Sequence, residues 1–374
     1  WTVDSERAIL ATEGYKKYDG EPQLLKVAKT TAHIMNKVKL HIVDDQLMVG
    51  DSAAPPKSCP IYPEFSFDWI VNELSQDPII RERPHNRYDY NDKVRDDLLG
   101  MADYWKGKTL SDEMLSRLSP DEMKGDFMGI MLYSTSLYHF AGVGHLVPNF
   151  DGVLSNGLGG LRQQVQERLD ALDDNDDRRT FYQAQLINLD SSINYIHRYA
   201  SLAREKAAKA EGQRRDELLQ MADNLQLIAE KPPQTFWQAY QLIHLVWSII
   251  IIESNGHSVS LGRLDQTLYP YFRRDIDEKV CSHEFIQEII ECLAPLNASF
   301  MKLRDWLTTQ ANSGRGLNTT TVTLGGMDAD GNDVTNELSG MFLDMIAHTR
   351  LANPWIAVRL HPDTPNWFEN KAAK

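Results

Sequence analysis

Arg162 and Gln166 are the two side chains of this sequence best placed to hold an anion. They stand four residues apart in a predicted helix, so they would share one helix face. The helix follows Gly159-Gly160, and a glycine-rich entry to a helix N-terminus favours anion binding. Arginine offers a planar fork of donors and glutamine adds an amide donor. The spacing therefore predicts a site for a small oxyanion.

A solvated helix surface is the alternative for the same pattern. Gln164 and Arg168 stand close by at the same spacing and are equally good candidates for an exposed pair. The chain has 39 Lys and Arg against 53 Asp and Glu, a net charge of −14. Such an acidic protein is not expected to bind nucleic acid or an anionic membrane surface. An anionic ligand would need a local cation, and Arg162 would supply it.

The sequence contains no recognisable metal or dinucleotide motif. Its three cysteines, Cys59, Cys281 and Cys292, form no CxxC pair, and its 11 histidines show no HExxH. The odd, small number of cysteines is typical of a reducing compartment. The longest apolar run, Leu242 to Ile252, is too short to span a bilayer, and no signal peptide is evident. We therefore expect a cytoplasmic protein.

Hydrophobic periodicity predicts an α/β protein in which long helices precede late strands. The clearest predicted helices are Phe181–Ile228, Thr235–Glu253, His283–Leu303 and Glu337–Thr349. Short β-branched or apolar runs predict strands at His41–Val43, Leu47–Val49, Thr319–Leu324 and Trp355–Leu360.

Several segments, in order along the whole chain, resemble the glycyl radical enzymes of the pyruvate formate-lyase type. They are Glu6–Glu13, Asp45–Gly50, Pro60–Glu64, Asn255–Ser258 with Leu261–Gln266, Thr323–Gly326, Asn336–Leu338, and Asn353-Pro354 with Val358-Arg359. Each motif alone is weak, but the ordered set is specific. The resemblance implies an α/β fold, the first half of a ten-stranded α/β barrel wrapped by many helices.

Two family motifs have no match in this sequence. The reacting cysteine of the family lies in a Gly-Cys-Val-Glu-like loop, and its radical glycine lies in an Arg-Val-x-Gly-Tyr-like loop. We therefore expect residues 1–374 to be an incomplete N-terminal domain with no catalytic residue, no metal and no bound cofactor. The resemblance implies an organic glycyl radical on the missing part, installed by a radical-SAM activating enzyme, and a homodimer.

Within the family, the isethionate sulfite-lyases are expected to hold their substrate's sulfonate with an Arg and a Gln at this spacing. Arg162 and Gln166 match that pair. The resemblance thus implies a lyase that cleaves the C–S bond of isethionate to acetaldehyde and sulfite. His257 and Ser258 match positions that contact a diol hydroxyl in the glycerol dehydratase branch, and His145 matches another. The alternative to substrate contact is a structural role, in which His257 is buried and hydrogen-bonded to a neighbouring backbone group.

Two other functions stay open. One is a glycyl radical dehydratase of glycerol or propanediol, or another C–X lyase such as a choline-type C–N lyase. The other, from a different class, is a non-catalytic half-barrel fragment. An enclosed Arg162 without a nearby acid would favour the enzyme, whereas an Arg162 paired to a surface carboxylate would favour the scaffold.

Overall fold

A computed structural model describes residues 1–76, 79–122, 145–256, 258–306, 309 and 320–374. Its longer helices are α1 (Glu6–Lys17), α2 (Gln23–Lys37), α10 (Phe150–Asp170), α11 (Arg178–Ala207), α12 (Gly212–Ile228), α13 (Phe236–Ser254), α15 (Tyr269–Asp277), α16 (His283–Ser299) and α18 (Glu337–Thr349). The shorter helices are α3 (Asp68–Ser75), α4 (Ile79–Glu82), α5 (Asp92–Leu99), α6 (Ala102–Trp105), α7 (Leu110–Ser116), α14 (Leu264–Thr267) and α19 (Asn366–Ala372). No helix in this part of the chain is long and apolar enough to cross a membrane.

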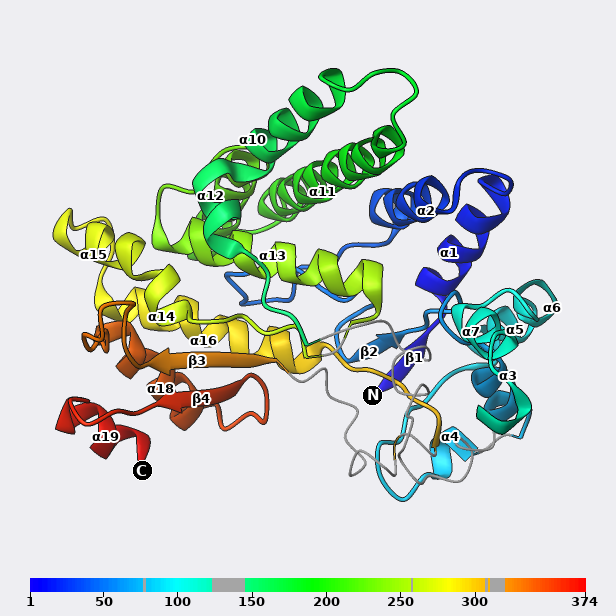
Figure 1. Cartoon of the computed structure of the whole chain (residues 1–374). Coiled ribbons are helices and arrows are strands. Elements are labelled where there is room, and N and C mark those ends of the chain that lie inside the picture. Colours follow the sequence, from blue (N-terminus) through cyan, green and yellow to red (C-terminus); the bar gives the residue numbers. More distant parts are fainter. Residues whose placement is uncertain (77–78, 123–144, 257, 307–308, 310–319) are drawn as a thin grey trace.

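The described residues form two small parallel sheets. β1 (Thr2–Asp4) pairs with β2 (Ser58–Pro60), and β3 (Thr321–Gly325) pairs with β4 (Trp355–Arg359). In the second sheet Thr321 lies opposite Trp355, and α18 lies between the two strands in sequence. Parallel strands need such a crossover, so the expected α/β architecture is confirmed. Figure 1 shows β3 and β4 below α13 and α16.

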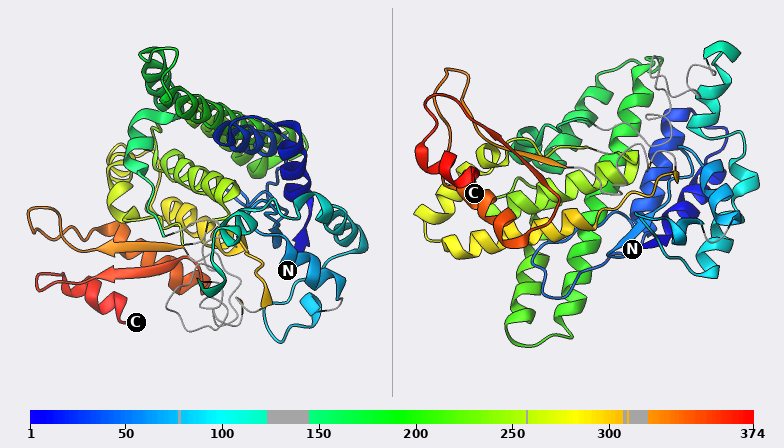
Figure 2. Two further views of the ribbon diagram at one scale, coloured as in Figure 1. Left: turned by 45° about the vertical axis from the view of Figure 1, so that its right-hand side comes forward. Right: turned by 90° about the horizontal axis from the view of Figure 1, so that it is seen from below.

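Helix α13 is the centre of the larger of two hydrophobic cores. Thr235 caps its N-terminus, because its side-chain oxygen accepts a hydrogen bond from the backbone N–H of Gln238. Its side chains are apolar all round, as expected for a buried helix, and it contacts α10, α11, α12, α15 and α16. Figure 2 shows these helices packed around it. A smaller core joins α1, α3 and α5 near the N-terminus.

The predicted strands at 41–43 and 47–49 are wrong. Side chains of α13 bind the backbone at 47–49, and Lys206 of α11 donates to Ile42 O at 2.8 Å. The Gln241 amide accepts from Val49 N at 2.8 Å and donates to Val49 O at 2.7 Å. The Trp237 indole donates to Leu47 O at 3.1 Å. Leu47, Met48 and Val49 are buried, and these backbone groups of Leu47 and Val49 are hydrogen-bonded without a partner strand. The predicted helix 181–228 is interrupted at Ala208–Glu211, where α11 ends and α12 begins.

A buried arginine joins the two cores. The Arg7 side chain is 1% exposed and pairs with Glu64, with Nη2 2.5 Å and Nη1 3.2 Å from the carboxylate oxygens. The same guanidinium donates to Ile252 O in the last turn of α13, at 2.9 and 3.1 Å, and lies 3.6 Å above the Tyr62 ring. Arg7 thus ties α1 and the loop at Glu64 to the C-terminal end of α13.

Replacing Arg7 with Met should destabilise the protein by about 3–5 kcal/mol, because Glu64 would be left buried without its cation. Urea denaturation measures the loss. The matched control is Arg178→Met, whose exposed pair with Asp176 should contribute less than about 1 kcal/mol. The double variant Arg7→Met with Glu64→Gln should recover part of the loss. Equal midpoints for Arg7→Met and the parent would contradict this role.

Glu253 lies half-buried near the C-terminus of α13, and the partial loss of solvent raises its carboxyl pKa above the usual 4.5. At a pH between the pKa of Glu253 in the unfolded chain and its higher pKa in the folded protein, the folded protein keeps a proton that the unfolded chain has lost. Stability therefore falls as pH rises through that interval. Glu253→Gln should raise the urea midpoint at about pH 8 and leave it unchanged near pH 4. Glu205→Gln, where Lys209 lowers the carboxyl pKa, should give no such gain.

Candidate functional site

The segment 258–262 lies along the edge of β3. Leu261 N donates to Thr321 O at 2.9 Å, and Thr323 N donates to Gly262 O at 2.8 Å. Gly262 and Val322 form a parallel bridge, so this segment extends the β3–β4 pair by a third parallel member. The Arg263 guanidinium then donates to Gly325 O at 2.7 Å and fixes the end of β3. The residues that follow Ser258 therefore pair with the sheet.

A second segment, distant in sequence, reaches the same place. Ser260 N donates to Leu146 O at 2.9 Å, and a side-chain carbon on Gly262 would lie only 3.0 Å from Val147. His145 and Ser258 both adopt left-handed backbone conformations, with φ of 60° and 55°. Such conformations are uncommon outside glycine and gather at functional sites. The structure thus brings the segments of these two predicted site residues together.

The end of α13 holds this junction in place. Asn255 ends the helix in a left-handed conformation, with its N–H bonded to Ile251 O at 3.0 Å. Lys302 Nζ donates to Asn255 O, and Lys302 is almost fully buried. Burial holds the pKa of Lys302 well below its usual range, and the Arg304 charge lowers it further. No sequence pattern pointed to Lys302, because a single lysine in a mixed segment does not reveal that it is buried.

Chemically, the junction offers an imidazole and a hydroxyl, both of which can donate to and accept from a substrate hydroxyl. His145 is exposed and Ser258 is half-buried. His257 lies outside the described residues. Cys59 is buried in β2, where its thiol donates to Met301 O at 3.2 Å and accepts from Leu303 N at 2.9 Å. Burial raises the pKa of that thiol to about 12. The described residues contain no group of three potential metal ligands.

Arg162 and Gln166 lie on an exposed face of α10 and not in an enclosed site. Arg162 pairs with Asp190 of α11 through Nε and, at 3.3 Å, through Nη2. The two side chains are 41% and 52% exposed, and the carboxylate raises the pKa of the guanidinium. Gln166 donates to Asp170 at 2.7 Å. Of the two arrangements weighed for Arg162, the structure has the one in which a carboxylate pairs with it. Sulfonate binding by Arg162 and Gln166 stays a prediction.

A model of the pyruvate formate lyase-like family matches residues 1–374. The chain is 43% identical to (2S)-3-sulfopropanediol dehydratase of Klebsiella oxytoca over 98% of its length and 45% of that protein. It is 29% identical to isethionate sulfite-lyase of Oleidesulfovibrio alaskensis over 100% of its length and 46% of that protein. The chain spans about half the length of these relatives.

The fold agrees with this likeness. The glycerol-bound B12-independent glycerol dehydratase of Clostridium butyricum superposes with a TM-score of 0.94 at 31% identity. The superposition covers 100% of this chain and 47% of the dehydratase. The family model and the structural likeness both extend over the whole chain, and together they identify it as a member of the pyruvate formate lyase-like family.

Proposed function

We propose that the protein containing this chain is a glycyl radical dehydratase that removes water from a small sulfonate-bearing diol. The observation that carries the proposal is the junction of the His145 and Ser258 segments, joined by the 2.9 Å hydrogen bond between Ser260 and Leu146. Both positions match diol-contacting positions of the glycerol dehydratase branch. The junction would hold the hydroxyls of a diol, whereas isethionate has only one.

The relatives support the same choice. Identity to the sulfopropanediol dehydratase is 43%, against 29% to an isethionate sulfite-lyase. C–S cleavage of isethionate, which the Arg162 and Gln166 pattern favours, thus becomes the second candidate. The surface pairing of Arg162 is the arrangement expected of a non-catalytic scaffold, but the high identity to a dehydratase over nearly the whole chain favours an enzyme.

In this proposal the chain positions the substrate. His145 and Ser258 would bind the two hydroxyls, and Lys302 would hold the loop after α13 through Asn255. Fixing the hydroxyls in one rotamer would align the departing oxygen, which is catalysis by positioning. A glycyl radical supplies hydrogen-atom abstraction in this family. None of the three cysteines of the chain lies in a Gly-Cys-Val-Glu-like loop, so no radical step is assigned to them. The proposed partners are a radical-SAM activating enzyme and a second copy of the protein.

Calorimetry with the full-length, unactivated protein tests the substrate class. We expect 2,3-dihydroxypropane-1-sulfonate to bind more tightly than isethionate. Ser258→Ala should weaken diol binding by about tenfold, the cost of one lost hydrogen bond. Ser201→Ala, at an exposed site, is the matched control. Tighter binding of isethionate would overturn the dehydratase proposal in favour of the lyase.

Arg162→Ala decides whether the surface pair binds sulfonate. Because Asp190 already holds the guanidinium at the surface, we expect the affinity for the sulfonated diol to change less than about twofold. Asp190→Asn releases the guanidinium without removing it and should be equally silent. A loss of about tenfold or more on Arg162→Ala, confined to sulfonated ligands, would restore Arg162 and Gln166 as the sulfonate site.

A further inference from the structure

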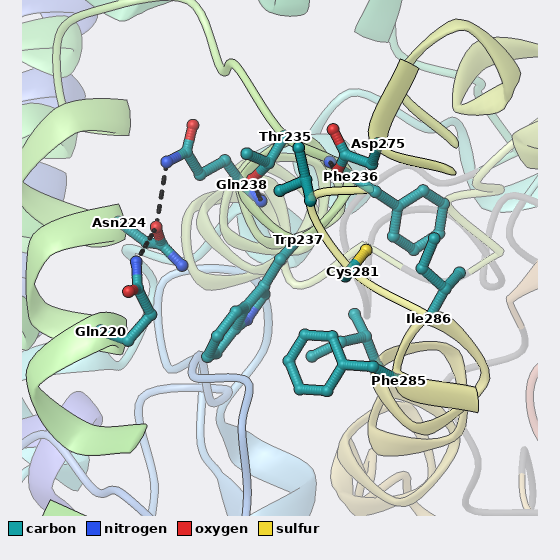
Figure 3. Close-up of a pocket in the computed structure, with 12 residues that line it drawn as sticks. Gln220, Asn224, Thr235, Phe236, Trp237, Gln238, Asp275, Cys281, Phe285 and Ile286 are labelled. Carbon is teal, nitrogen blue, oxygen red and sulfur yellow. Dashed lines mark hydrogen bonds between the residues drawn. The ribbon is translucent and has the colours of Figure 1, made fainter. Parts of the chain in front are cut away.

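A separate pocket lies at the opposite end of α13 from the Ser258 loop. Its volume is about 310 Å³, and it lies among the second half of α12, the first turn of α13 and the connection from α15 to α16 (Figure 3). Because α13 has 19 residues, about 28 Å of helix separates the two places. The pocket is within the size range of small-molecule sites.

One side of the pocket presents an amide donor with a fixed orientation. Gln234 N donates to Gln238 Oε1 at 2.8 Å, so the other end of the Gln238 amide is its nitrogen. That nitrogen donates to Asn224 Oδ1 at 2.9 Å, which leaves Asn224 Nδ2 on the side of the pocket, as Figure 3 shows. Asn224 is 3% exposed, and its Nδ2 has no hydrogen-bond partner among the described residues. A ligand that supplies an acceptor would satisfy this buried donor.

The charges around the pocket favour a neutral ligand. The described residues that line it include one charged group, Asp275, and no lysine, arginine or histidine. Asp275 Oδ2 accepts from Phe236 N at 2.6 Å, and Oδ1 is buried with Arg274 Nε 3.6 Å away, so neither oxygen is open to a ligand. An anion would lose its hydration without gaining a cation, and a cation would reach no carboxylate.

The polar atoms of the pocket favour a ligand that only accepts hydrogen bonds. Asn224 Oδ1 accepts from Gln238 and also from Gln220 Nε2 at 3.1 Å, and Gln238 Oε1 is occupied as well. The Thr235 hydroxyl accepts from Gln238 N at 3.3 Å and can still donate its own hydrogen. A ligand O–H or N–H would therefore find few acceptors, whereas a carbonyl oxygen has two lone pairs and no hydrogen.

Aromatic rings form an apolar wall of the pocket. Trp237 and Phe285 meet edge to face with their centroids 5.5 Å apart. The indole N–H of Trp237 is already bonded to Leu47 O, so the ring offers the pocket an apolar surface only. Burial raises the pKa of the Cys281 thiol to about 11, so it lines the pocket as a neutral group. Such a wall favours a flat ring in the ligand.

We propose that this pocket binds a small, neutral aromatic carbonyl compound, an aryl ketone or aldehyde. Its carbonyl oxygen would accept from Asn224 Nδ2, and its ring would pack on Trp237 and Phe285. Because no cation lines the described part of the pocket, this is not a second site for a sulfonated substrate. A hydrocarbon of the same shape would fill the space but leave Asn224 without an acceptor.

Calorimetry of the full-length, unactivated protein with acetophenone tests the proposal, and it needs no turnover. We expect acetophenone to bind about tenfold more tightly than ethylbenzene, which has a similar shape and no oxygen, and at least about tenfold more tightly than benzoate. Asn224→Leu removes the donor at similar size and should lower the affinity for acetophenone to that for ethylbenzene. Asn194→Leu, on the exposed face of α11, is the matched control and should keep the preference of the parent.

The thiol of Cys281 reports where acetophenone binds, and this measurement needs no variant that could fail to fold. Cys281 lines the pocket and is half-buried, so bound acetophenone should slow its modification by methyl methanethiosulfonate, followed by mass spectrometry of the peptides. Cys292 is half-buried outside the pocket and should react at an unchanged rate.

Four results would each overturn the proposal. They are no binding of acetophenone, equal or tighter binding of ethylbenzene or benzoate, an unchanged preference in folded Asn224→Leu protein, and no protection of Cys281. Diol binding at the Ser258 loop is measured separately with a different ligand and does not depend on any of them.

Discussion

The rest of the structure depends on the buried ion pair between Arg7 and Glu64. Removing two charges from water is costly, and the pair is tolerated because the guanidinium is hydrogen-bonded along its edges and one of its faces is covered. The Glu64 carboxylate accepts hydrogen bonds from one edge of the guanidinium, Ile252 O accepts from another edge, and the Tyr62 ring covers one face. The carbonyl of Ile252 belongs to the last turn of α13, where the helix dipole is negative and a cation is favourable. The smaller N-terminal core is thereby attached to the helix that carries the Ser258 loop.

Helix α13 was predictable because its signals are local. An apolar run bounded by Thr235, a good capping residue, leaves few alternatives to a buried helix, and the observed range differs by one residue at each end. The late strands β3 and β4 and helix α18 were predictable for similar reasons. The segment at 47–49 was not, because its apolar residues are buried by Gln241 and Trp237, which lie almost two hundred residues away. A local sequence pattern cannot predict that a side chain from a distant helix will form the hydrogen bonds that a neighbouring strand would otherwise form.

The candidate site, like the fold, was predictable only in part from the sequence. Spacing correctly places Arg162 and Gln166 within one helix, but it does not say which helix face meets the core. That choice is made by α11, whose Asp190 lies beside Arg162. Ser258 and His145 were found through family likeness, and only the folded chain shows that their segments are hydrogen-bonded neighbours. Neither residue spacing nor family resemblance pointed to Lys302, because its burial depends on three-dimensional packing alone.

The two ends of α13 are stabilised by side chains of opposite character, an acceptor at the N-terminus and donors at the C-terminus. At the N-terminus, Asp275 accepts from the first backbone N–H of the helix, as a carboxylate should at the positive end of the dipole. At the C-terminus, Arg7 and Lys302 donate to the carbonyls of Ile252 and Asn255. Each of these three side chains is buried, so folding has already removed it from water. A substrate held beside the Asn255 loop would therefore bind next to groups that are already desolvated and oriented, which reduces the cost of binding.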